Sequence, residues 1–193
     1  MAPLYVEPYE VLVEVLGKQF KYFGFSDTII AVSQTDDATV IGKAASKIFS
    51  ALLSFSIASR VFITKGDFSF HRFEQLAERP DTFLCPIYGS TLLDAYQMDQ
   101  LGMKCLGAFA HKNVISQFET MQNVKFQDES EVGFLNLNRY LVDDEISKIK
   151  CTASNLSQRS EGAMALHCET LGEALSGKDV VVRTNEGNRN STA

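Results

Sequence analysis

Two stretches of the chain give the clearest indications of its fold: RVFITKGDF at residues 60–68 and YGSTLLDAYQMD at residues 88–99. The first predicts a β-strand, because β-branched and aromatic residues run up to a Gly-Asp pair that favours a turn. The second predicts a helix, because a glycine opens a run of helix-forming residues. Tyr96 and Asp99 are three residues apart, and Ala95 and Asp99 are four apart, so one side of this helix can present all three.

Helices and strands alternate on both sides of these stretches. The expected helices cover residues 9–16, 36–55, 90–101 and 114–121, and the expected strands cover 20–32 (a hairpin around 24–27), 61–64, 82–87, 104–110 and 134–140. Asp36 and Asp37 are the candidate caps of the second helix. This order predicts an α+β fold whose open sheet includes the hairpin and carries helices on one face.

Composition and charge limit the possible classes of protein. With 193 residues, 45% of them hydrophobic, the chain can bury one core. A net charge of -6 argues against a surface that binds duplex nucleic acid. The apolar run at residues 48–58 is shorter than the roughly 20 residues of a membrane helix, and the start lacks the order of a secretory signal. We therefore expect a cytoplasmic protein with no membrane partner.

Cysteines and histidines form no metal-binding pattern in the sequence. They are scattered along the chain at Cys85, Cys105, Cys151, Cys168, His71, His111 and His167. No CxxC pair occurs, so we expect free thiols of a reducing compartment. We expect surface or loop positions for the three histidines and assign them no chemistry.

The end of the chain carries weaker patterns. We expect a main domain over residues 1–142, a helical extension over 143–175 and a flexible tail over 176–193. One or two short helices are expected in the extension. The tail is polar and rich in Gly and Asn, which is typical of mobile segments.

Five segments occur in an order that resembles class III nucleotidyl cyclase catalytic domains: FSDTIIAV, RVFITKGDF, YGSTLLDAYQMD, CLGAFAH and FLNLNRYL. The likeness is closest to the divergent bacterial branch that includes the pyrimidine cyclases of antiphage defence. There a strand of the type RGxIxxGE precedes a GxxLxxAYxLE helix. The resemblance covers residues 9–141. It implies a ferredoxin-like, cyclase-type sandwich, with a mainly antiparallel sheet and helices packed on it.

The resemblance also implies a reaction and a set of site residues. Such cyclases form a cyclic mononucleotide and pyrophosphate from a nucleoside triphosphate, in a homodimer, with Mg²⁺ or Mn²⁺ held by two carboxylates. Asp27 matches the second metal ligand, although Asp also suits a turn. Arg60 and Lys65 are the nearest candidates for phosphate contact, or else solvated charges at the strand ends. Gln97 stands where other branches carry a catalytic Arg, and Asp99 could border the nucleotide.

The first of the two metal carboxylates has no match in this chain. Upstream of Asp27 the acids are Glu7, Glu10 and Glu14, in or beside an expected helix. Either the chain begins downstream of the first cyclase strand, or it is a degenerate relative that has given up catalysis. A catalytically inactive cyclase-homology domain for nucleotide binding, dimerisation or regulation is the alternative function. An unrelated ferredoxin-like module is the third possibility.

Overall fold

The computed structural model describes residues 6–25, 28–70, 74–76, 79–84, 87–101, 105–118, 121–122 and 132–178. The helices are α1 (Val6–Leu16), η2 (Gly17–Gln19), α2 (Ala38–Ser54), α3 (Ser90–Gln100), α4 (Lys112–Ile115), η3 (Leu137–Arg139), α5 (Asp143–Arg159) and α6 (Ala163–Leu175). The strands are β1 (Phe20–Phe25), β2 (Thr28–Ser33), β3 (Arg60–Ile63), β4 (Ser69–Phe70), β5 (Glu74–Leu76), β6 (Arg79–Leu84), β7 (Ile87–Tyr88), β8 (Gly107–His111), β9 (Met121–Gln122) and β10 (Val132–Leu135). The fold is α+β, as the sequence predicts.

A four-stranded sheet with the order β3–β8–β10–β9 forms the centre of the molecule. β3 and β8 are parallel, with Arg60 opposite Gly107, whereas β10 is antiparallel to both β8 and β9. Parallel neighbours need a crossover connection, and α3 lies in that connection between β3 and β8. The crossover places α3 directly on the two parallel strands.

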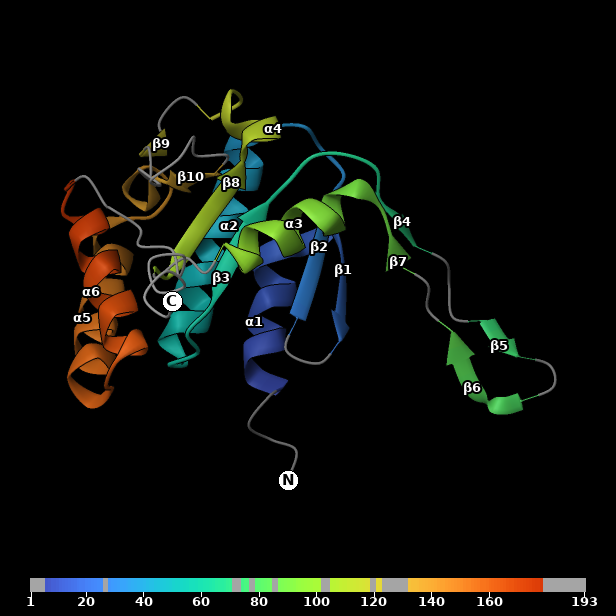
Figure 1. Ribbon diagram of the computed structural model, residues 1–193, viewed down its shortest axis with the longest axis horizontal. Coiled ribbons are helices and arrows are strands. Elements are labelled where there is room, and N and C mark those ends of the chain that lie inside the picture. The colour runs from blue at the N-terminus through green and yellow to red at the C-terminus, as the bar shows by residue number, and fades with distance from the viewer. Residues whose placement is uncertain are drawn as a thin grey trace, which may run out of the picture.

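Helices cover both faces of the parallel pair. Figure 1 shows α3 in front of β3 and β8 and α2 behind them, and both helices contact these strands. Every residue of β8 and β10 is buried, as expected for strands covered on both faces. The expectation of helices on one face only is therefore wrong. It failed because periodicity shows that a helix has an apolar side but not which face of a sheet it covers.

Aromatic side chains fill the core between the sheet and its helices. Phe49 of α2, Phe109 of β8 and Phe134 of β10 are fully buried. The rings of Phe109 and Phe134 meet edge to face, with centroids 5.4 Å apart. A Cβ on Gly107 would lie 2.5 Å from Cε2 of Phe134, so a glycine is needed for the strands to close over this ring.

The hairpin expected at residues 20–32 is present as β1 and β2, paired in antiparallel register with Phe25 opposite Thr28. It forms a two-stranded sheet of its own in the described residues, so the expectation that the main sheet includes it is wrong. Figure 1 shows it beside α1, and Phe20 packs with Leu16 and Ala44 in a small separate core. Further two-stranded sheets join β4 with β7 and β5 with β6.

The strand expected over residues 134–140 is misplaced. β10 ends at Leu135 and is wholly buried, not half-exposed, and the 3-10 helix η3 follows it. Asn136 ends the strand because its side-chain oxygen accepts a hydrogen bond from the Asn138 N–H (3.2 Å). Local side-chain chemistry therefore overrides the alternating pattern here.

The C-terminal helices belong to the same hydrophobic core as the sheet. α5 and α6 pack against each other, α5 also packs on α2, and their buried residues include Ile149 and Leu171. They are two full helices of 17 and 13 residues. The boundary at residue 142 stays a prediction, and of the expected tail only residues 176–178 are described. Across the described residues, no helix has the length and apolar character to cross a membrane.

Candidate functional site

The two stretches that best indicate the fold pack against each other. α3 runs antiparallel to β3, so its last turn meets the start of the strand and its first turn meets the loop after the strand. At the first of these ends Arg60 Nη2 lies 2.9 Å from Asp99 Oδ1. The pair fixes the last turn of α3 to the sheet. Asp99, one of the two acids of α3, is therefore engaged by a residue of the same chain.

The junction at the other end joins the backbone of Asp67 to side-chain hydroxyls of α3 and requires a glycine. The Asp67 N–H donates to Ser90 Oγ (3.1 Å), and Thr91 Oγ1 donates to the Asp67 carbonyl (3.0 Å). Gly89 has φ +153°, and a Cβ there would lie 2.0 Å from the Asp67 carbonyl oxygen. Asp67 thus follows a bend at Gly66, where the sequence predicts a turn, and its backbone groups anchor the start of α3.

Four polar residues gather where β3 and β8 end, and we call them the carboxyl-end cluster: Lys65, Asp94, His111 and Asn113. The Asn113 side chain accepts from the Lys65 N–H (3.3 Å) and donates to the Lys65 carbonyl (2.6 Å) and to Asp94 Oδ2 (3.1 Å). His111 Nδ1 lies 3.8 Å from Asp94 Oδ2 and caps α4 by accepting from the Asn113 N–H (3.5 Å). The cluster links β3, α3 and β8.

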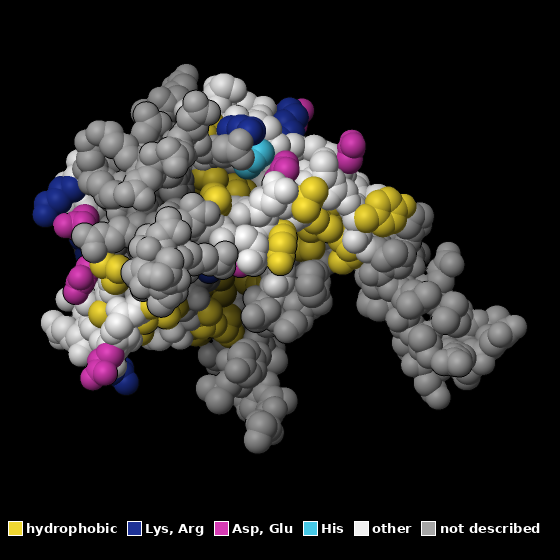
Figure 2. Space-filling view, viewed as in Figure 1, with side chains coloured by type: hydrophobic (Ala, Val, Ile, Leu, Met, Phe, Trp, Pro, Cys, Tyr) yellow, Lys and Arg dark blue, Asp and Glu magenta, His cyan; other side chains and the backbone are white. Residues whose placement is uncertain are grey.

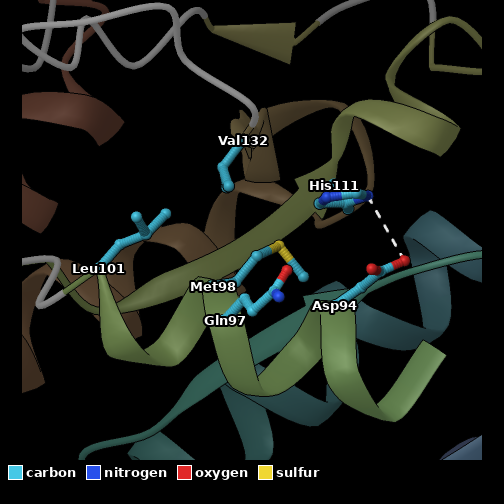
Figure 3. Close-up of a pocket in the computed structure, with 6 residues that line it drawn as sticks. All are labelled: Asp94, Gln97, Met98, Leu101, His111 and Val132. Atoms are coloured by element: carbon cyan, nitrogen blue, oxygen red, sulfur yellow. Dashed lines mark ion pairs between the residues drawn. The ribbon is translucent and has the colours of Figure 1, made fainter. Parts of the chain in front are cut away.

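A small cavity of about 40 Å³ lies between α3 and β8. Figure 3 shows the side chains that line it: Asp94, Gln97, Met98, Leu101, His111 and Val132. This volume holds a few water molecules, whereas drug-sized ligands occupy roughly 300 Å³ or more. The cavity does not admit a nucleotide.

The structure places the predicted substrate residues at different ends of β3. Arg60 and Asp99 bind each other at its start, whereas Lys65 lies beyond its end with Nζ 3.5 Å from Asp36 Oδ1. Gln97 lines the small cavity together with Asp94 and His111 of the carboxyl-end cluster. A substrate role for these residues stays a prediction. Asp27 lies outside the described residues.

Sequence reasoning missed Asp94, His111 and Asn113. His111 was expected in a surface or loop position, but it is the last residue of a buried strand and is 7% exposed. The signal lay in the pattern GAFAHKN, in which a histidine and an asparagine follow an apolar run directly. Their partner Asp94 could not be identified from the sequence, because it belongs to α3, and only the folded chain places α3 beside the end of β8.

The outer side of α3 is exposed and uncharged. We use this name for Leu93 (57% exposed), Tyr96 (62% exposed) and Gln100, with Tyr88 just before the helix and Leu101 just after it. Figure 2 shows hydrophobic side chains gathered along α3 and beside β7 on this face. Scattered exposed leucines are ordinary, but two aromatic side chains in one exposed patch are typical of interaction surfaces.

A larger groove of about 340 Å³ lies between α1, α2 and α5. Lys47 of α2 and Glu145 of α5 form an ion pair at its edge. Partial burial alone would raise the pKa of the Glu145 carboxyl, but hydrogen bonds from Lys47 and from the Val142 N–H, with the charges of Lys47 and Lys148, lower it overall. The charged form of Glu145 therefore stabilises the packing of α5 on α2.

No family model matches the chain, and neither a curated protein nor a solved structure is significantly similar to it. The assignment of a function consequently depends on the residues and on their geometry.

Proposed function

We propose that this chain is a protein-interaction module that docks a basic amphipathic helix of another protein on the outer side of α3. The single observation that carries the proposal is the division of α3 into two sides. Its acids Asp94 and Asp99 are directed at the sheet and paired there, while Leu93 and Tyr96 are left in solvent. Apolar side chains in water favour a partner that covers them.

The anchoring of α3 makes the outer side suitable for binding. The Arg60–Asp99 pair, the Gly89 junction and the carboxyl-end cluster hold the helix at both ends. A surface that is already ordered loses little conformational entropy when a partner binds. Tyrosine supplies a large contact area from a side chain with few rotatable bonds, which is why it is frequent among residues that dominate binding energy.

Charge favours a basic partner over a second copy at this surface. α3 contains two acids and neither Lys nor Arg, and the whole chain has a net charge of -6. Two copies of the chain would bring two net negative charges together. A helix whose apolar stripe is flanked by Lys or Arg would cover Leu93 and Tyr96 and meet an acidic protein.

A matched pair of synthetic helices tests the proposal. Both peptides have about 18 residues, above the length at which isolated helices are marginal, and carry the same leucine stripe with either lysine or glutamate on the remaining positions. Fluorescence anisotropy of the labelled peptides measures the dissociation constants. We expect the lysine peptide to bind, and Tyr96→Ser to weaken it about tenfold or more.

Val142→Ser is the control variant, because Val142 is 64% exposed at the start of α5 and does not belong to the outer side of α3. It should leave the dissociation constant unchanged. Equal binding of the glutamate peptide would refute the charge argument. Binding of the lysine peptide that survives Tyr96→Ser would show that general attraction to an acidic protein, and not the outer side of α3, holds the peptide.

Cyclase chemistry is a separate proposal that rests on the sequence resemblance. It comprises the ferredoxin-like arrangement, a nucleoside triphosphate as substrate and Mg²⁺ or Mn²⁺ bound through Asp27. Within the described ranges no three His, Cys, Asp or Glu side chains are grouped so as to hold a metal ion, and Asp27 lies outside those ranges. The Arg60–Asp99 pair supports the alternative of a non-catalytic relative, because it occupies two of the residues expected to bind substrate.

A further inference from the structure

The outer edge of β2 has no strand partner in the described part of the chain. β2 pairs with β1 on one side, and no described strand lies against its other side. None of its six residues is buried, and Thr28 and Ala31 are exposed. Natural sheets usually protect such edges with charged residues, proline or bulges. The sequence TIIAVS has none of these, whereas β1 carries Lys21.

The hydrogen-bond pattern of the hairpin identifies which backbone groups of β2 face outward. The Gln34 N–H donates to the Gln19 carbonyl (2.9 Å), so residues 19 and 34 form a bonded pair of the ladder. Bonded and non-bonded pairs alternate along antiparallel strands. Val32 and Ile30 therefore bond to β1, and the N–H and C=O groups of Ile29, Ala31 and Ser33 point away from it.

We propose that two copies of the chain dimerise by antiparallel pairing of their β2 edges about a twofold axis at Ala31. When two copies of a strand pair antiparallel about a twofold axis, the residue numbers of any two facing residues add up to the same even number. Centring on Ala31 pairs it with the partner's Ala31 and pairs Ile29 with the partner's Ser33. This register uses all the outward backbone groups of β2 and joins two hairpins into one four-stranded sheet.

The side chains in this register are compatible with close pairing. At the centre of the pair, the small Ala31 of one copy faces Ala31 of the other copy. β2 contains no charged residue that would face a like charge. The contact is limited to one strand, so the dimer should be weak, with a dissociation constant of micromolar or above. Because each chain has a net charge of -6, added salt should strengthen it by screening. This dimer uses a surface separate from α3.

Cysteine crosslinking tests the register directly. Bonded antiparallel pairs have Cα atoms about 5.5 Å apart, within the range of about 4.4–6.8 Å that a disulfide spans. Ala31→Cys, in a chain whose exposed Cys151 is replaced by Ser, should form a disulfide-linked dimer under mild oxidation. Thr28→Cys is the matched control: Thr28 is also exposed, but its two copies would lie about 20 Å apart. The Cys151→Ser parent controls for the remaining native cysteines.

Ala31→Pro supplies a second readout by sedimentation velocity. It removes an outward N–H and leaves the inward bonds of the hairpin, so the dimer should dissociate about tenfold more readily or not form at all. Ala31→Thr keeps the N–H and should remain dimeric. A monomer at all concentrations, or equal crosslinking by Ala31→Cys and Thr28→Cys, would overturn the inference. Neither result would bear on peptide binding by α3.

Discussion

Replacing Gly89 with alanine should destabilise the protein by about 2 to 5 kcal/mol. The backbone φ of +153° is in a region that only glycine adopts readily, which costs about 1 to 3 kcal/mol for another residue. The added Cβ would lie 2.0 Å from the Asp67 carbonyl oxygen, so the start of α3 must move. That movement breaks the bonds from Asp67 to Ser90 and from Thr91 to Asp67, each contributing about 0.5 to 1.5 kcal/mol.

Urea unfolding followed by circular dichroism measures this loss. The midpoint falls by the lost free energy divided by the urea slope of about 1 to 3 kcal/mol per molar, which gives a shift of about 1 M or more. Gly172→Ala is the matched control: it lies within α6, its Cβ would meet nothing within 4 Å, and alanine should stabilise that helix by about 0.5 to 1 kcal/mol. If Gly89→Ala were as stable as the wild type, the junction between the Gly-Asp turn and α3 would be wrong.

Three further predictions concern separate parts of the molecule. Because the pKa of Glu145 is lowered in the folded state, its stabilising effect is present above its unfolded value of 4.5 and is lost as the pH falls through the folded pKa. Acid unfolding curves of Lys47→Met should show a weaker pH dependence, because only the Val142 N–H and Lys148 still lower this pKa. Parallel curves for the variant and the wild type would contradict this prediction. Burial, with a smaller effect of neighbouring Cys168, raises the pKa of the Cys105 thiol to about 12. Iodoacetamide at pH 8 should therefore label the exposed Cys151 but react with Cys105 only after the protein is unfolded. Peptide mass spectrometry measures the labelling of each cysteine. Incubation with each of the four nucleoside triphosphates and Mn²⁺ tests the cyclase proposal; a cyclic product that persists in Asp27→Ala would refute the metal assignment.

Local chemistry made part of the fold predictable from the sequence. Asp37 was a candidate cap of the second helix, and its side chain does accept from the Thr39 and Val40 N–H groups. The hairpin at residues 20–32 and the helix after Gly89 were predictable for the same reason, since turn and cap residues act over a few positions. Neighbouring residues therefore determine where these elements begin and end.

Long-range pairing made the rest unpredictable. The parallel contact of β3 with β8 joins segments on either side of α3, and nothing in either strand specifies its partner. The same limit applies to the site: the Arg60–Asp99 pair and the burial of His111 against Asp94 both depend on where the crossover places α3. Residue type alone suggested that Arg60 and Asp99 were available to a ligand.

Amide chemical-shift mapping with the lysine peptide locates the bound peptide on the protein. In ¹H–¹⁵N spectra recorded during the titration, we expect the largest changes at residues 88–101, centred on Leu93 and Tyr96. The amides of β2 and of α5 should not respond. Changes concentrated in those elements, or spread evenly over the acidic surface, would contradict the proposal that the outer side of α3 is the docking surface of this protein.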